Sequence, residues 1–159
     1  MDGYNLIGIY HNDLNRQREE LIQLLIRYKK IKRHDITVVF DGWKSGGGRE
    51  EQHTAGGVRV IYSKLGEKAD AVIKRIISRE KNEWIVITSD REIMSHAWGC
   101  GSVPVPSAEF QRILEKCDTS ATGTYDLIEE DYDEGRQRKG NPLKPSKKDK
   151  ALMRILKKL

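Results

Sequence analysis

Three aspartates, Asp2, Asp41 and Asp90, stand at a chain turn or at the end of a short apolar run. Asp41 directly follows Ile36–Phe40, and Asp90 follows the run that begins at Trp84, after two polar residues. A short uninterrupted apolar run is typical of a strand buried on both faces of a parallel sheet. Open α/β sheets place their ligands at the carboxyl ends of such strands. The pattern therefore predicts that the three carboxylates gather at one edge of a sheet.

Two further acids, Glu67 and Asp70, open the helix that we expect after the next apolar run. Their i, i+3 spacing predicts neighbouring positions on one helical face. Crowded carboxylates repel one another unless a divalent cation compensates their charge, and ligands that are all oxygens suit Mg²⁺ or Mn²⁺. We therefore expect Asp2, Asp41, Asp70 and Asp90 to be metal ligands, with Glu67 as a further catalytic carboxylate.

Each of these acids also has an ordinary structural explanation. The two acids of the helix could complement its dipole, and Asp41 could belong to an Asp-Gly turn. Ser89 and Glu92 fit a capping box, which would place Asp90 in the first turn of a helix. The placement of all five acids at one edge favours a metal site over these separate explanations.

The apolar periodicity predicts strands that alternate with helices. The expected strands are 36–40, 58–62, 84–88 and 103–105, and the expected helices begin near residues 14, 66, 91 and 107. This alternation predicts an α/β fold with a mainly parallel sheet of about four to five strands flanked by helices. Residues 43–57 contain five glycines, and we expect them to form a long functional or mobile loop.

The charge divides the chain into unequal parts. Its formal net charge is +5, but residues 136–159 hold ten Lys or Arg and one acid, so the preceding residues are net negative. We expect a domain over 1–117, an acidic linker over 118–135, and a flexible basic tail over 136–159 whose end forms an amphipathic helix. A basic tail on an acidic body indicates a polyanionic partner such as RNA. A solubilising disordered tail is the alternative.

Composition excludes some other classes of protein. At 159 residues the chain is long enough to bury the core of one domain. It contains no apolar run long enough for a membrane helix and no basic-then-apolar start typical of a signal peptide. Cys100 and Cys117 give no disulfide framework and no metal-binding pattern, so we expect a reducing cytoplasm.

Six short motifs, in chain order, resemble those of the NYN domain and more narrowly of its YacP-like branch, which is related to PIN and FLAP-type nucleases. They are DGYNLI, ITVVFDG, GVRVIYS, GEKADAVI, VITSDREI and PSAEF, and they cover roughly residues 2–117. The resemblance implies a Rossmann-like (PIN-like) sheet and a Mg²⁺- or Mn²⁺-dependent endoribonuclease linked to translating ribosomes. The positions that match the motif residues of this family are Asp2, Asn5, Asp41, Glu67, Asp70 and Asp90.

The chain departs from that family pattern in two places. Members usually carry an apolar strand before DGYN, whereas here only Met1 precedes it. We therefore expect the N-terminal, central strand to be missing, with the start lying upstream, the chain truncated, or Leu6–Tyr10 taking its place. Ala71 stands where a second adjacent acid is common, and we expect this to weaken metal binding.

The leading hypothesis is an endoribonuclease that acts on single-stranded RNA, including mRNA. Asn5 and Ser89 would position the metal or a phosphate oxygen, and Arg91 would hold a phosphate unless it is an ordinary exposed residue. Trp43 and Lys44 would supply a stacking platform and backbone attraction, although core packing explains the tryptophan equally well. One rival is an RNA- or ribosome-binding module without catalysis, and another is a nucleotide-handling α/β enzyme. The sequence does not indicate an oligomeric state.

Overall fold

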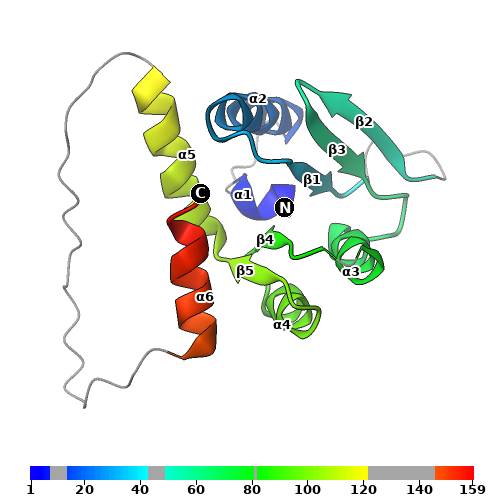
Figure 1. Ribbon diagram of the computed structural model, residues 1–159. Coiled ribbons are helices and arrows are strands. Elements are labelled where there is room, and N and C mark those ends of the chain that lie inside the picture. The colour runs from blue at the N-terminus through cyan, green and yellow to red at the C-terminus, as the bar shows by residue number, and fades with distance from the viewer. Residues whose placement is uncertain (8–13, 43–48, 81, 122–145) are drawn as a thin grey trace.

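The structure, a computed structural model, describes residues 1–7, 14–42, 49–80, 82–121 and 146–159 (Figure 1). Helices and strands alternate along most of the chain, as predicted. The helices are α1 (Gly3–Leu6), α2 (Leu14–Lys32), α3 (Ala69–Arg79), α4 (Arg91–Gly99), α5 (Ser107–Ala121) and α6 (Lys147–Leu156). The strands are β1 (Thr37–Phe40), β2 (Glu51–Ala55), β3 (Val58–Tyr62), β4 (Ile85–Ile87) and β5 (Val103–Val105).

The strands form two small sheets, so the predicted single sheet of four to five strands is wrong. One sheet has the order β1-β3-β2 and the other pairs β4 with β5. Only Met1 and Asp2 lie between them. Asp2 forms an isolated parallel bridge with Val39, and its N–H donates to the carbonyl of Ile87 at 3.2 Å. On the β1 side, the Met1 ammonium also donates to the Thr37 carbonyl at 2.8 Å, and the Val39 N–H donates to the Met1 carbonyl at 2.9 Å. These two residues connect the sheets without forming a strand of their own.

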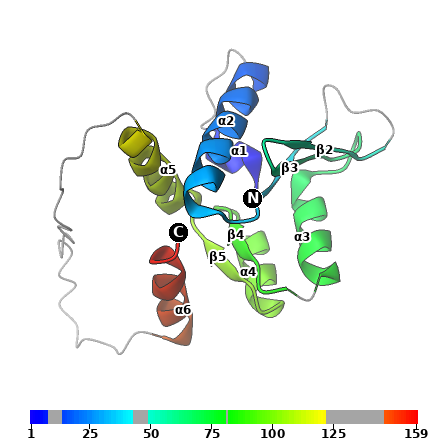
Figure 2. The same ribbon diagram turned by 45° about the horizontal axis from the view of Figure 1, so that its top comes forward.

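Strand alternation produces a hydrophobic core on each face of this layer. Val38 and Phe40 of β1 point to the face that α2 and α5 cover, and Val39 points to the face that α3 and α4 cover. Successive side chains of a strand point to opposite faces, so both faces of the apolar runs are buried. The prediction of strands buried on both faces is confirmed for β1 and β4, whereas Arg59 of β3 is exposed. Figure 2 shows the helices that flank these strands.

Strand β2 was not predicted, because 51–55 fell inside the expected loop of 43–57. It pairs antiparallel with β3, and four of its five residues are exposed. An exposed edge strand carries no apolar alternation, so hydrophobic periodicity cannot detect it. The available signal was the turn. Gly56 and Gly57 both have positive φ, as the two central residues of a tight hairpin require.

The end of the basic segment is helical, as predicted, and it packs on the body. In α6 and the residues after it, Leu152, Ile155, Leu156 and Leu159 contact the core between α2 and α5. The acidic segment and most of the basic segment, 122–145, lie outside the described residues. Within the part of the chain that the structure describes, no helix has the length and apolar character needed to cross a bilayer.

Candidate active site

The predicted acids occupy the edge at which the parallel strands end. Asp41 follows β1, Asp90 lies three residues after the end of β4, and Asp2 bridges to β1 between the two sheets. Asp70 is the second residue of α3, whose N-terminus lies at the same edge. Consecutive β and α elements therefore deliver four carboxylates from distant parts of the sequence to one side of the molecule.

Asp2 is the most enclosed of the four. It is 6% exposed, and it caps α1 by accepting hydrogen bonds from the N–H groups of Tyr4 and Asn5. Burial raises the pKa of its carboxyl, and the negative charge of Asp70 raises it further, whereas the hydrogen bond from the backbone of Asn5 opposes the shift. Ionisation of Asp2 therefore costs more free energy in the folded protein than in the unfolded chain.

Asp70 connects the other acids electrostatically. Burial raises the pKa of its carboxyl, and the charges of Asp90 and Asp41 add to the rise, while Lys74 and Lys68 oppose it. Like charges disfavour ionisation only when they are close. Asp70 thus lies within electrostatic reach of each of the other three aspartates.

Asp90 is the N-cap of α4. Its Oδ1 accepts hydrogen bonds from the N–H groups of Glu92 at 2.7 Å and Ile93 at 3.0 Å. The predicted capping box, with Ser89 as the cap, is therefore wrong by one residue. The aspartate itself satisfies the free N–H groups of the first turn. Ser89 is exposed beside it, and Arg91 is the exposed first residue of α4.

A hydrogen-bond chain links Asp2 to Asp90. The Asn5 side-chain amide donates to Oδ2 of Asp2 at 2.6 Å and to Oγ1 of Thr88 at 3.3 Å. The same Thr88 oxygen accepts the N–H of Asp90 at 3.1 Å. Thr88 is fully buried, and sequence reasoning did not single it out. A hydroxyl at the end of an apolar run, two residues before an acid, was the signal available.

Glu67 does not belong to this group. It lies before Lys68, the N-cap of α3, so the predicted helical i, i+3 relation to Asp70 is wrong. Its carboxylate pairs with Arg75 at 2.5 Å. The helix begins at Ala69 instead of near residue 66, so Glu67 precedes it and its carboxylate pairs with Arg75 of α3 instead of facing the other acids.

The glycines after Asp2 and Asp41 are required by close packing. A Cβ at Gly42 would come within 1.8 Å of the carbonyl oxygen of Ser63, and one at Gly3 within 2.1 Å of the Phe40 ring. Each Asp-Gly pair therefore does more than form a turn. The glycine lets the chain turn away from the sheet edge in close contact with neighbouring atoms, while the aspartate stays at that edge.

The donor chemistry of this edge fits a hard divalent cation. The four aspartates offer only oxygen, which Mg²⁺ and Mn²⁺ prefer. The described hydrogen bonds to Asp41 and Asp90 reach only Oδ1, which leaves Oδ2 of each available. Among the described residues, no group of three acids, histidines or cysteines is arranged to hold a metal ion.

Two predicted site residues, Trp43 and Lys44, lie outside the described residues. A cavity of about 50 Å³ lies elsewhere, where the two sheets separate. Its lining includes Met1, Thr37, Ile73 and Trp84, and none of the predicted site residues. The indole N–H of the tryptophan is buried there without a described partner.

Comparison with known proteins places the chain among similar folds. The family model described as the YacP-like NYN domain matches residues 1–157. Two crystal structures of Rae1 (YacP) from Bacillus subtilis are similar, one of the protein and one of a tryptophan-to-leucine mutant. Each is 27% identical and covers 76% of this chain, with TM-scores of 0.62 and 0.63 and with 75% and 76% of the Rae1 chain covered. Among curated proteins, no sequence matches.

Proposed function

The chain belongs to the YacP-like NYN domain family, and from this premise we propose that it is a divalent-metal-dependent endoribonuclease. It would hydrolyse RNA phosphodiester bonds at the edge that carries Asp2, Asp41, Asp70 and Asp90. The observation that carries the proposal is the gathering of four carboxylates at one edge, where burial and then their mutual repulsion raise the pKa of Asp2 and Asp70. A protein that keeps four acids in such surroundings sacrifices stability, as functional sites commonly do.

The four aspartates would hold Mg²⁺ or Mn²⁺. When bound, such an ion lowers the pKa of water and offsets the negative charge that develops on a phosphoryl group.

The surrounding residues would orient the reacting groups. Asn5 and Thr88 fix the carboxylate of Asp2 and the backbone at Asp90 by hydrogen bonds. Arg91, exposed at the start of α4, would hold a phosphate oxygen of the substrate. Ser89, exposed on the same turn, would donate to another.

The substrate would be single-stranded RNA, and mRNA bound to ribosomes is one form of it. The family membership and the 27% identity to Rae1 (YacP) support an RNA-directed activity. Both cysteines are free, one of them exposed, which agrees with a reducing cytoplasm as the place of action.

The decisive experiment is an RNA cleavage assay with Mg²⁺, Mn²⁺ or EDTA. We expect labelled single-stranded RNA to be cut internally with either metal and to remain intact in EDTA. Asp41→Asn serves as the inactive control, since it keeps the shape of the side chain and removes its charge.

A second function is favoured by one observation. Ala71 stands where a second adjacent acid is common in the family, and this favours an RNA- or ribosome-binding module without catalysis. Binding of RNA without cleavage in either metal would support this alternative and contradict the nuclease.

A further inference from the structure

Helix α6 lies along the edge opposite the carboxylates. At its start, the Lys148 ammonium stands 5.4 Å from the ring centroid of Trp98, near the end of α4. Beyond its end, the Leu159 carbonyl accepts a hydrogen bond from the Tyr28 hydroxyl of α2 at 3.2 Å. Helices α4 and α2 lead into β5 and β1, so their ends mark the edge at which those strands begin. The carboxylates lie where the strands end.

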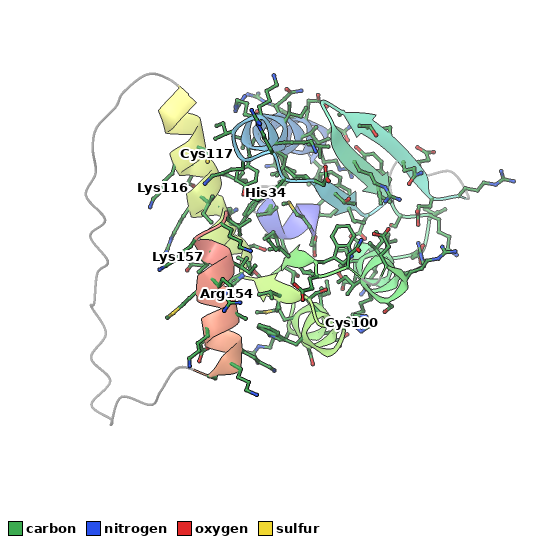
Figure 3. The ribbon with its side chains drawn as sticks, viewed as in Figure 1. His34, Cys100, Lys116, Cys117, Arg154 and Lys157 are labelled. Carbon is green, nitrogen blue, oxygen red and sulfur yellow. The ribbon has the colours of Figure 1, made fainter. Side chains whose placement is uncertain are left out.

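Two basic segments from opposite ends of the sequence meet at this edge. Nε2 of His34 lies 3.2 Å from the carbonyl oxygen of Lys158 (Figure 3). Lys32 and Arg33 directly precede the histidine, and Lys157 lies beside Lys158. We call these four residues, Lys32, Arg33, Lys157 and Lys158, the basic junction. All four side chains are exposed.

The side-chain carboxylates that the structure describes form no ion pair with the basic junction. The described ion pairs of acidic side chains involve other cations. The adjacent acid Asp35 pairs with Lys29 at 2.8 Å. The one acid of α6, Asp149, caps the far end of that helix with Ser146. Positive charge is therefore concentrated where α2 and α6 meet.

The helix dipole explains only part of this arrangement. Basic residues at a helix C-terminus are favourable, and both α2 and α6 end here. Each helix would gain this stabilisation from its own basic residues even if the C-termini of α2 and α6 lay far apart. Bringing four like charges to one place costs electrostatic free energy unless an anion compensates them.

We propose that the basic junction binds the phosphate backbone of the RNA substrate, at a segment outside the one that is cleaved. The proposal rests on the endoribonuclease function. A catalytic edge of four carboxylates repels an RNA backbone, so a remote cationic surface would supply the attraction that the site itself lacks. Lysine and arginine contacts to phosphate carry no base specificity. The basic junction therefore sets the affinity for RNA, and the edge with the four aspartates determines where the RNA is cut.

The test compares two RNAs and two double variants. We would measure cleavage of a short RNA of about six nucleotides, enough for one binding groove, and of one several times longer. In Lys157→Gln/Lys158→Gln we expect the KM for the long RNA to rise about tenfold with kcat unchanged, and the short RNA to be cut as by wild type. Binding of the long RNA in EDTA should lose about 1.4 from the slope of log K against log salt, about 0.7 for each phosphate contact.

Lys147→Gln/Lys150→Gln is the matched control, because it removes the same charge from exposed positions in the first turn of α6. These positions are on the order of 10–15 Å from the junction along the helix. We expect this control to keep the wild-type KM and salt slope. Lys32→Gln, on the other segment, should raise the KM for the long RNA about threefold and should also leave kcat unchanged. Thermal melting of each variant confirms that it is folded.

Equal losses in the two double variants, or an unchanged KM and slope in Lys157→Gln/Lys158→Gln, would overturn the proposal. So would vesicles of phosphatidylserine that bind wild type and not this variant while RNA binding stays the same, since that result assigns the surface to a membrane. If wild type cuts neither RNA with Mg²⁺ or Mn²⁺, the endoribonuclease function fails. The binding measurement in EDTA still tests the junction by itself.

Discussion

Asp41 accepts a hydrogen bond from the main-chain N–H of Ala69, and this contact ties the end of β1 to the first residue of α3. Asp70 is the next residue, so the position of one acid sets the position of another that is distant in sequence. The carboxylate also satisfies a free N–H group of the helix start. The site is therefore built partly from the same contacts that stabilise the fold, and substitutions must be chosen to separate the two roles.

Asp90 allows such a separation. Asn caps a helix as well as Asp does, so Asp90→Asn should keep the thermal midpoint within about 1 °C while cleavage falls at least ~100-fold. Asp90→Ala loses the cap as well, which costs about 1 kcal/mol and lowers the midpoint by about 2–4 °C. Melting curves and initial rates check both. Wild-type cleavage by Asp90→Asn would remove this residue from the site.

Asp70→Asn should stabilise the metal-free protein. The carboxylate is partly buried and is repelled by Asp90 and Asp41, so its removal should raise the midpoint in EDTA by roughly 1–3 °C. Added Mg²⁺ or Mn²⁺ should stabilise wild type and should have little effect on the variant. Glu67→Gln is the comparison, because its partner is Arg75. An equal metal response in wild type and Asp70→Asn would contradict the role of Asp70 as a ligand.

The stability of the metal-free protein should fall as pH rises above the ordinary range of an aspartate. The pKa of Asp2 and of Asp70 is raised in the folded state, so the folded protein binds these protons more tightly than the unfolded chain does. Their contribution is fully present below the unfolded pKa, near 4, and is lost as pH rises through the raised values. Chemical denaturation in EDTA across this range measures the slope. A flat profile from these two groups would be the contrary result, and Asp70→Asn should reduce the slope.

Gly42→Ala should destabilise the protein by roughly 2–3 kcal/mol, because its Cβ would overlap the carbonyl oxygen of Ser63. Gly99→Ala is the control. No atom lies within 4 Å of the added carbon there, and alanine is favoured over glycine in a helix by up to about 1 kcal/mol. Urea denaturation compares the two. If Gly42→Ala were as stable as Gly99→Ala, packing would not explain the Asp-Gly pair.

Thr88→Val should slow catalysis, because it removes the oxygen that accepts from both Asn5 and the backbone of Asp90. The two shapes are nearly equal, so the loss is one of hydrogen bonding. We expect a decrease in kcat of about tenfold and in stability of about 1–2 kcal/mol. Thr88→Ser, which retains the hydroxyl, should restore kcat. A valine variant with normal kcat would limit Thr88 to a structural role.

The sequence by itself determined the elements with strong periodicity. The apolar runs that become β1 and β4 are short and continuous, β3 is apolar except for Arg59, and the amphipathic spacing of α2 and α3 is helical. Burial therefore specifies these elements. The sequence also indicated which acids gather at one edge, since alternating strands and helices bring strand ends and helix starts together. Exposed β2, which has no apolar alternation, was missed for the same physical reason.

Tertiary structure decided what depends on contacts between distant segments. Asp90 rather than Ser89 became the cap of α4, one residue later than the capping box required. Glu67 paired with Arg75 because α3 begins about three residues later than expected. The sheet divided because the two residues at its centre form no strand of their own. The end of the basic segment packed on the body because its apolar face contacts a core that includes residues of α2, β5 and α5. Local sequence fixes which residues are apolar, but only the folded chain fixes which surface buries them.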